Sequence, residues 1–330
     1  MFRQSVGNRL RDGRKPATFA ASFIQNIHIM HYKLSLMTLL AAFPLLGLCQ
    51  GYVRYDYIPS SSLKDKDGSK YGSVNLQRIS GRYTVPLSRS MNERNQPTAW
   101  ALTLSASYGM MENKGEAKEL NPDKILNTGL TVSHLRPLSK RWSLIASLGA
   151  GIYASPDDVS WQNLLASGAF IFAYRLSDNL SIGFGGGLTN SYGVPIIMPM
   201  GYLSWRTGGR YEVLVDIANA MKVQVAKQMG KAVKLELTAM EMDGMTAVIH
   251  TDGRQKLYSS VMISSGLDVS FRLFRRTSLH AGVGGMWLRS STITDRTLKS
   301  FFKSLSDDDD GGKLRFNPAF HFSAGLRCGF

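Results

Sequence analysis

Apolar and polar residues alternate with a period of two along much of the chain beyond residue 50. Between Trp100 and Tyr108 the even-numbered residues are apolar, and their odd-numbered neighbours are small or polar. The same rhythm runs through residues 142–152, 180–185 and 261–272. Successive side chains of a β-strand point to opposite faces, whereas a helix repeats every ~3.6 residues. The pattern therefore predicts an all-β protein whose strands each have one apolar face.

Two sizes of connection separate the predicted strands. Short polar turns are expected at residues 139–141, 177–179, 207–209, 229–230 and 275–277, and longer polar loops at residues 111–124, 155–163, 241–256 and 290–313. Outer-membrane β-barrels have short periplasmic turns and longer extracellular loops. The pattern predicts a single transmembrane antiparallel up-and-down β-barrel of about twelve strands, within a range of about ten to fourteen.

The end of the chain supports a barrel. Beyond residue 50 no apolar run approaches the ~20 residues of a membrane-spanning helix, so only a closed barrel would suit a membrane. Phe320, Phe322, Leu326 and Phe330 alternate with small or polar residues. They resemble the C-terminal recognition strand of bacterial outer-membrane proteins. The resemblance implies an assembly signal read by the barrel-assembly machinery, with outer-membrane lipid and lipopolysaccharide as further partners.

The N-terminal part reads as an export signal. After Met30, Lys33 precedes an apolar run and the small residues Gly47 and Cys49, which predicts a signal peptide over residues 30–49 with cleavage after Cys49. Residues 1–29 are interpreted as a mis-assigned extension, residues 50–73 as an N-terminal segment and residues 74–330 as the barrel. A lipoprotein is the alternative, but Leu48 stands where a small residue is needed. These features predict an outer-membrane location.

Composition narrows the function classes. The chain has 330 residues, 44% of them hydrophobic, and a formal charge of +15. Residues 1–49 hold six basic residues and one acidic residue, so +10 remains beyond them. This charge is spread over turns and strand ends rather than gathered on one face, which argues against a nucleic-acid-binding protein. The two cysteines, Cys49 and Cys328, leave no internal disulfide after cleavage.

Residues 74–330 also resemble the uncharacterised outer-membrane β-barrel families of Gram-negative bacteria, described as domains of unknown function. Residues 195–244, with a Pro-Gly entry, a Trp, a turn and two short strands, are similar to the middle hairpins of these families. The resemblance implies a fold and a location. It implies no activity, because these families have none assigned.

Candidate chemistry is sparse. His321 and Ser323 share one face of the last strand and resemble the His and Ser of outer-membrane lipid A deacylases, but no acid two residues away completes a triad. The acidic run Asp307, Asp308, Asp309 and Asp310 lacks the alternating spacing of a calcium loop and reads as a surface loop. We expect no metal, no cofactor and no catalytic activity.

Seven charged residues are predicted to face the lumen, because they fall on the polar face of their strands: Glu212, Asp216, Lys234, Glu236, Asp268, Arg272 and Arg327. Such charges either line a polar channel or pair across a filled interior.

The first functional hypothesis is a porin-like or structural barrel for an unidentified solute. A lipid-modifying enzyme using His321 and Ser323 is the second, and a surface binding or assembly component acting through the loops is the third.

Overall fold

The computed structural model describes residues 50–64, 67–209, 211–217, 221–251, 253–305 and 314–329, all within the compact unit 47–330. The predicted extension 1–29, the signal peptide 30–49, the run Asp307–Asp310 and the terminal Phe330 lie outside these residues. They therefore stay predictions.

Antiparallel strands make up nearly all of the described chain. The strands are β1 Gln50–Lys64, β2 Lys70–Met91, β3 Pro97–Lys114, β4 Lys124–Pro137, β5 Trp142–Ala154, β6 Leu164–Arg175, β7 Leu180–Thr189, β8 Ile196–Arg206, β9 Tyr211–Asp216, β10 Lys222–Gln228, β11 Val233–Thr251, β12 Arg254–Phe274, β13 Thr277–Asp295, β14 Leu314–Phe316 and β15 Ala319–Cys328. Among the described residues, short helices lie in the loops: α2 Ala117–Leu120, η2 Pro156–Asp158, η3 Trp161–Asn163 and α3 Leu298–Leu305.

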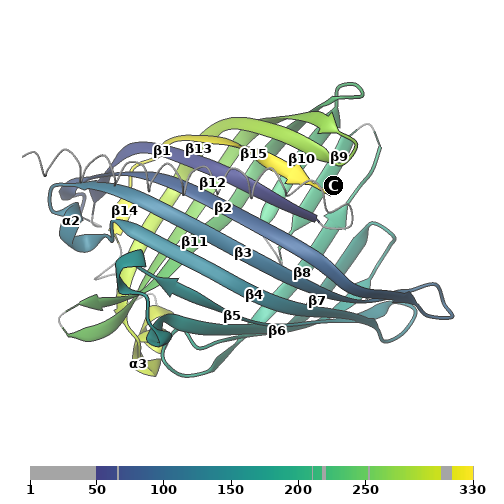
Figure 1. The fold of residues 1–330 in the computed structure, drawn as a ribbon, viewed down its shortest axis with the longest axis horizontal. Helices are drawn as coiled ribbons and strands as arrows, with labels where there is room; N and C mark the ends of the chain where they lie inside the picture. Colours follow the sequence, from purple (N-terminus) through teal and green to yellow (C-terminus); the bar gives the residue numbers. More distant parts are fainter. Residues whose placement is uncertain are drawn as a thin grey trace, which may run out of the picture. The chain divides into compact units, whose positions relative to one another are not determined.

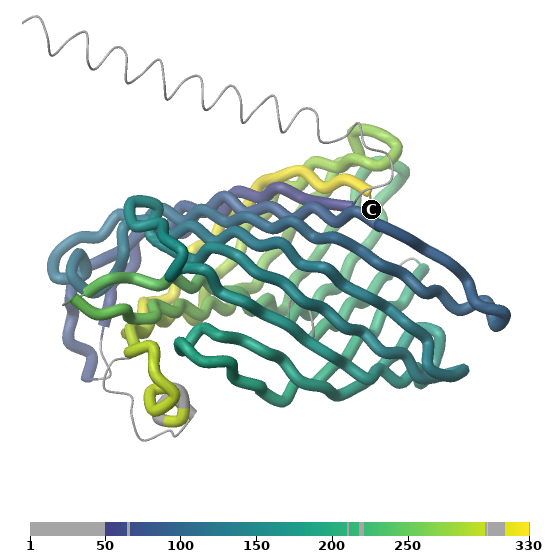
Figure 2. The backbone as a smooth tube through the Cα atoms, turned by 60° about the horizontal axis from the view of Figure 1, so that its bottom comes forward, coloured from purple at the N-terminus to yellow at the C-terminus, as the bar shows by residue number. Residues whose placement is uncertain are grey.

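The sheet closes into a barrel. Each strand from β1 to β13 pairs antiparallel with the next strand in sequence, and β15 pairs with both β13 and β1. The short β14 also pairs with both β13 and β1. Strands β14 and β15 therefore occupy one strand position in the wall, and the barrel has fourteen strands. Figure 1 shows the wall, and Figure 2 shows purple β1 running beside yellow β15 where the sheet closes. The predicted fold class is confirmed.

The barrel has a turn end and a loop end. The short connections after β4, β6 and β12 lie at the same end as Gln50 and Gly329, which we call the turn end. Helices α2 and α3 lie at the opposite end, which we call the loop end (Figure 1). In outer-membrane barrels the short turns face the periplasm.

Two boundaries differ from the sequence-based expectation. Strand β1, Gln50–Lys64, belongs to the wall, since it pairs with β2, so the described part of residues 50–73 is not a separate segment. Residues 241–256 and the start of 290–313 were expected to be loops, but β11, β12 and β13 extend through them as long strands. Of the polar residues that suggested loops, Glu241 and Asp243 face the interior.

The outer surface carries large apolar side chains on most strands. Exposed examples from seven different strands are Leu104, Leu130, Leu148, Phe184, Leu267, Val283 and Phe322. A soluble protein rarely exposes so much contiguous apolar surface, whereas a membrane barrel requires an outward apolar band.

Strand β11 changes its facing halfway along. Lys234 and Glu236 face the interior, but the pairing with β12 slips between Thr238 and Glu241. A β-bulge of this kind inserts one residue and reverses the alternation beyond it. Glu241 and Asp243 therefore also point inward.

The strands of the wall beside this bulge are short. Strands β9 and β10 have only six and seven residues, and β8 pairs with β9 through Ser204–Arg206 alone. Beyond Glu241, β11 has no partner in β10 and instead reaches β5, where Val248 pairs with Ala154. The β11–β12 hairpin thus crosses toward the far wall at the loop end.

Candidate functional site

The turn-end half of the barrel encloses a cavity of about 840 Å³. Its lining includes Gln50 at the start of β1, Gly329 just after β15, and Arg275 and Arg276 in the β12–β13 turn, so the cavity reaches the turn end. Ligand sites in proteins have volumes of roughly 300–1,000 Å³. This cavity is therefore large enough for a small solute.

Charged side chains dominate the cavity wall. Of the described residues that line it, nine are basic and four are acidic. The four acids are Glu212, Glu236, Glu241 and Asp243, and each has a cationic partner. The interior thus has a cationic excess even after all four acids are neutralised.

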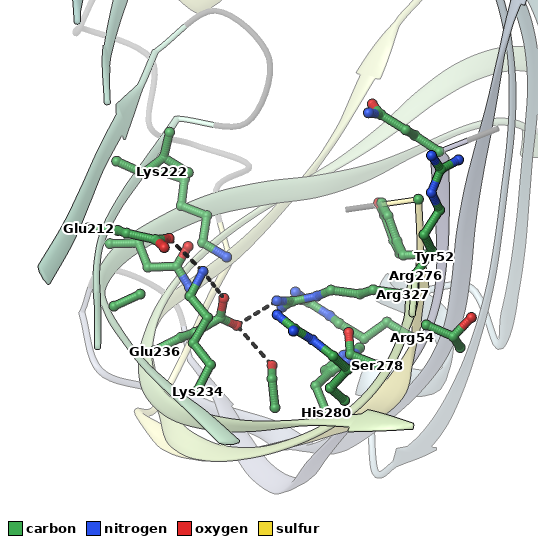
Figure 3. A pocket seen from close by; sticks show the side chains of 18 of the residues that line it. Tyr52, Arg54, Glu212, Lys222, Lys234, Glu236, Arg276, Ser278, His280 and Arg327 are labelled. Carbon is green, nitrogen blue, oxygen red and sulfur yellow. Dashed lines mark hydrogen bonds and ion pairs between the residues drawn. The ribbon is translucent and has the colours of Figure 1, made fainter. Parts of the chain in front are cut away.

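One ion-pair cluster is centred on Glu236 of β11. Its carboxylate accepts hydrogen bonds from Arg327 of β15 and, at 3.3 Å, from Ser270 Oγ of β12. Lys234 Nζ lies 3.7 Å from Glu236 and 2.7 Å from Glu212 Oε2 on β9 (Figure 3). The cluster ties four strands together around the cavity.

A second cluster is centred on Asp56 of β1, which is 1% exposed. Arg54 Nε donates to its Oδ1 at 2.8 Å, Arg78 Nη2 of β2 donates to its Oδ2 at 3.1 Å, and His321 Nε2 of β15 lies 2.9 Å from Oδ1. A buried carboxylate needs such partners, because burying an unpaired charge is costly.

The two arginines of this second cluster also reach across the barrel. Arg54 Nη1 is 3.3 Å from Glu241 Oε1, and Arg78 Nη1 is 2.6 Å from Asp243 Oδ2. Strands β12, β13 and β15 separate β11 from β1 along the wall, so these pairs span the interior. These two ion pairs lie at the boundary between the polar cavity and the loop-end half of the interior.

Four cations of the cavity wall stand apart from both clusters. Among the described residues, no ion-pair partner lies beside Arg82, Arg206, Arg272 or Arg275. These side chains come from β2, β8 and the end of β12, toward the turn end. An anionic solute that enters from the turn end meets unneutralised guanidinium groups.

The loop-end half is filled by an apolar core, which we call the plug. It is made by Ile58, Leu63, Val74, Leu76, Met111, Ala117, Ile125, Met245, Ala247, Tyr258, Met262, Met286 and Phe316. Met245 of the crossing hairpin packs so closely against β3 that a Cβ at Gly109 would lie 2.8 Å from its sulfur. The plug therefore occupies the interior and leaves the cavity to the turn end.

The hairpin is held on its other face as well. Val248 and Leu257 pack with Leu165 of β6, and Asn163 Nδ2 donates to Val248 O at 3.1 Å. From β4, Asn127 Nδ2 donates to Thr246 O at 2.7 Å. The hairpin is thus held against the wall formed by β3 to β6.

Arg296, just beyond β13, joins three loop-end segments. Its guanidinium donates to Ser191 O at 3.0 Å, to Gln162 O at 3.1 Å and to Gln255 Oε1 at 2.9 Å. Burial lowers the pKa of Arg296, because leaving water disfavours the charged form. His250 and Asp158 form a further contact between the hairpin and η2.

The candidate catalytic pair does not assemble. His321 and Ser323 both face the interior, but His321 contacts Asp56, and Ser323 Oγ donates to Asp268 Oδ1 at 3.0 Å. The sequence offered no acid near His321, whereas the fold supplies Asp56 from a strand 265 residues away. The serine hydroxyl nevertheless has a carboxylate partner instead of the imidazole that would activate it.

The predicted lumen charges are all on the interior face. Glu212, Lys234, Glu236, Arg272 and Arg327 line the cavity. Asp268 contacts the inward Ser323, and Asp216 is the register partner of Lys222, another lining residue.

Sequence reasoning missed further interior charges. Arg54 and Asp56 lay in the segment excluded from the barrel, and Glu241 and Asp243 lay in an expected loop. The others are Arg78 and, on the cavity wall, Arg82, Arg206, Lys222, Arg275 and Arg276. In residues 54–58, the alternation of Arg54, Asp56 and Ile58 with Tyr55 and Tyr57 was a usable signal for the first strand.

The last strand presents its aromatic residues outward. Phe320 and Phe322 are 69% and 43% exposed on the outer surface, and Leu326 pairs with Val53 of β1. Their use as an assembly signal stays a prediction.

Two searches of the described residues gave negative results. They contain no group of three or more His, Cys, Asp or Glu side chains placed to hold a metal ion. Among the same residues, no helix is long and apolar enough to cross a membrane.

Several solved structures share the barrel fold at low identity. The COG4313 outer membrane channel from Pseudomonas putida F1 has a TM-score of 0.42 and 10% identity, covering 86% of this chain and 96% of the channel. The P. putida toluene transporter TodX has a TM-score of 0.35 and 8% identity, covering 86% and 90%. The outer membrane protease OmpT from Escherichia coli has a TM-score of 0.23 and 11% identity, covering 86% and 94%.

Comparison with curated proteins gives no significant match. Residues 46–329 match the family described as "Domain of unknown function (DUF6268)", a span that contains the whole described barrel. The chain belongs to this family of unknown function.

Proposed function

We propose that the protein is an outer-membrane, porin-like barrel that passes small anionic solutes and uses its loop end as the gate. The observation that carries the proposal is the 840 Å³ cavity at the turn end, with its excess of cationic side chains. The outward apolar side chains support the membrane location.

Selectivity follows from the sign of the charge. Rings of arginine and lysine favour anions in pores. The four acids of the cavity are paired, so Arg82, Arg206, Arg272 and Arg275 determine the local potential. Anions with carboxylate or phosphate groups suit guanidinium groups, which form paired hydrogen bonds to both.

Gating follows from the plug. The apolar core and the Arg296 contacts fill the loop end in the state seen here. Passage of a solute requires the β11–β12 hairpin to move. Because β11 is bulged and the neighbouring strands β9 and β10 are short, the hairpin is attached to the barrel mainly through β12. We therefore expect brief openings from a mostly closed state.

The role is non-catalytic in this proposal. His321 and Ser323 serve the interior polar network through Asp56 and Asp268. Both contacts bind strands together, which suits a structural function.

The test is conductance in planar bilayers. The protein is first shown to be in the outer membrane by fractionation and to be folded by the shift in gel mobility on heating. Under a KCl gradient, the reversal potential should show preference for chloride. Replacing Arg82, Arg206, Arg272 and Arg275 by Glu should reverse that preference.

Arg94 provides the matched control. It lies in the β2–β3 turn at the same end, is exposed and is not part of the cavity wall. Arg94→Glu should leave the reversal potential unchanged. A cation preference in the wild type, or an unchanged potential in the fourfold variant, would contradict the proposal.

A further inference from the structure

Arg289 of β13 lies in the plug without a partner for its charge. The residue is 2% exposed, and none of its three guanidinium nitrogens has a hydrogen-bond partner among the described residues. Its Cζ atom lies 4.1 Å from the centre of the Phe316 ring. A stacked aromatic ring offsets part of the cost of burying the cation, but it accepts none of the five N–H hydrogen bonds.

Two buried hydroxyl groups lie beside it. Ser291 is two residues from Arg289 on the same face of β13, and Ser260 of β12 is directly opposite Ser291. Both Oγ atoms are buried, and the nearest polar group to them is the hydroxyl of Tyr258, which itself donates to Asn121 Oδ1. Arg289, Ser260 and Ser291 thus form a buried polar cluster on two neighbouring strands.

The surroundings of this cluster are apolar. Met262 and Phe316 are the register partners of Arg289 on its two sides, and both belong to the plug. No acidic residue forms an ion pair with Arg289 among the described residues. Buried polar groups are nearly always satisfied, and an unpaired buried charge is among the most costly arrangements in a protein.

We propose that Arg289, Ser260 and Ser291 form a binding site for a small monovalent anion, with chloride as its physiological occupant. The buried positive charge of Arg289 and its unused N–H donors select an anion over a cation, and the serine hydroxyls can donate to the same anion. Its enclosure by Met262 and Phe316 selects a small, weakly hydrated ion over phosphate or sulfate. Bound chloride neutralises the guanidinium and stabilises the packing of β12, β13 and β14 at the plug.

This inference concerns the plug and does not depend on conduction through the barrel. The first experiment uses the wild-type protein crystallised with bromide in place of chloride. An anomalous peak within hydrogen-bond distance of Arg289 and the two serine hydroxyls is expected. Absence of this peak, at a bromide concentration high enough to give the full stabilisation by halide, would overturn the proposal.

The second experiment measures the midpoint of heat-induced mobility shift at constant ionic strength. A ligand that binds only the folded state raises stability with its concentration. The wild-type midpoint should rise as chloride or bromide replaces gluconate, and Arg289→Met should abolish that dependence. Arg315→Met, an exposed arginine beside Phe316, should retain it.

If Arg289→Met does not assemble, the double variant Ser260→Ala with Ser291→Ala replaces it. That variant keeps the cation and should weaken the apparent chloride affinity severalfold. Equal midpoints for the wild type in chloride and gluconate would overturn the proposal. So would a halide-independent stability that falls when Asp307–Asp310 are replaced by Asn, because the counter-ion would then come from the chain itself.

Discussion

The two halves of the barrel interior use the same strands for opposite purposes. Near the turn end, β11 contributes Lys234 and Glu236 to a charged cavity wall, whereas near the loop end it contributes Met245 and Ala247 to an apolar plug. A single bulge after Thr238 separates the two stretches. The comparison shows that one inserted residue can change which side chains of a strand face the interior, so that the same strand lines the cavity at one end and fills the barrel at the other.

Polar contacts also differ between the halves. In the cavity, Lys234 and Glu236 of β11 pair with Glu212 of β9 and Arg327 of β15, and these charges remain beside open space. At the border with the plug, Arg54 and Arg78 join β1 and β2 to β11 across the interior. These border pairs mark the position along the barrel at which the cavity ends.

Locking the hairpin is expected to have the largest effect. In a Cys328→Ser background, Ala154→Cys with Val248→Cys should form a disulfide, since these residues are paired in adjacent backbone positions. Single-channel openings should disappear under oxidising conditions and return with reductant. Each single-cysteine variant is the control, and openings that persist in the oxidised double variant would show that the hairpin is not the gate.

Weakening the loop-end clamp should have the opposite effect on conductance. Arg296→Ala removes three hydrogen bonds between loop segments. We expect the open probability to rise about tenfold, equivalent to ~1.4 kcal/mol. Lys299→Ala, in the neighbouring exposed helix α3, is the control. An unchanged open probability in Arg296→Ala would exclude a gating role for these contacts.

The border between the halves is tested at Asp56. Asp56→Asn removes the buried negative charge that neutralises Arg54 and Arg78. The free energy of unfolding should therefore fall by about 3 kcal/mol. The midpoint of urea-induced unfolding in detergent measures this. Asp157→Asn, at an exposed position, should change it little. A comparable small change in Asp56→Asn would show that the border pairs do not stabilise the fold.

Ser323→Ala should have the smallest effect. It removes one hydrogen bond to Asp268, worth ~1 kcal/mol, and leaves the apolar plug intact. Lipid A from cells expressing this variant and from cells expressing the wild type should have the same mass spectrum. A wild-type modification of lipid A that is lost in the variant would restore the catalytic hypothesis for His321 and Ser323.

Much of the barrel follows from local pattern. The alternation in residues 100–108 and 142–152 predicted β3 and β5, and the turns at 139–141 and 177–179 connect strands where expected. The range of about ten to fourteen strands includes the observed fourteen. Strand pairing between sequence neighbours makes this possible, because each hairpin needs only local information.

The predicted site was incomplete for a physical reason. Glu236 and Arg327 are 91 residues apart, and Arg54 and Glu241 are 187 apart, so nothing local announces either pair. The sequence showed which charges fall on a polar face. It did not show which of them neutralise one another, and so did not reveal the cationic excess of the cavity.

The sequence by itself determined most of the strands, the short turns between them and the inward position of seven charged residues, because side-chain direction in a strand depends on position parity alone. Only the tertiary structure decided that β1 closes the barrel, that the β11–β12 hairpin helps to fill the loop end and that Arg289 is buried with no ion-pair partner among the described residues. Those features depend on closure and on a bulge that shifts the parity. They arise from contacts between segments far apart in the chain.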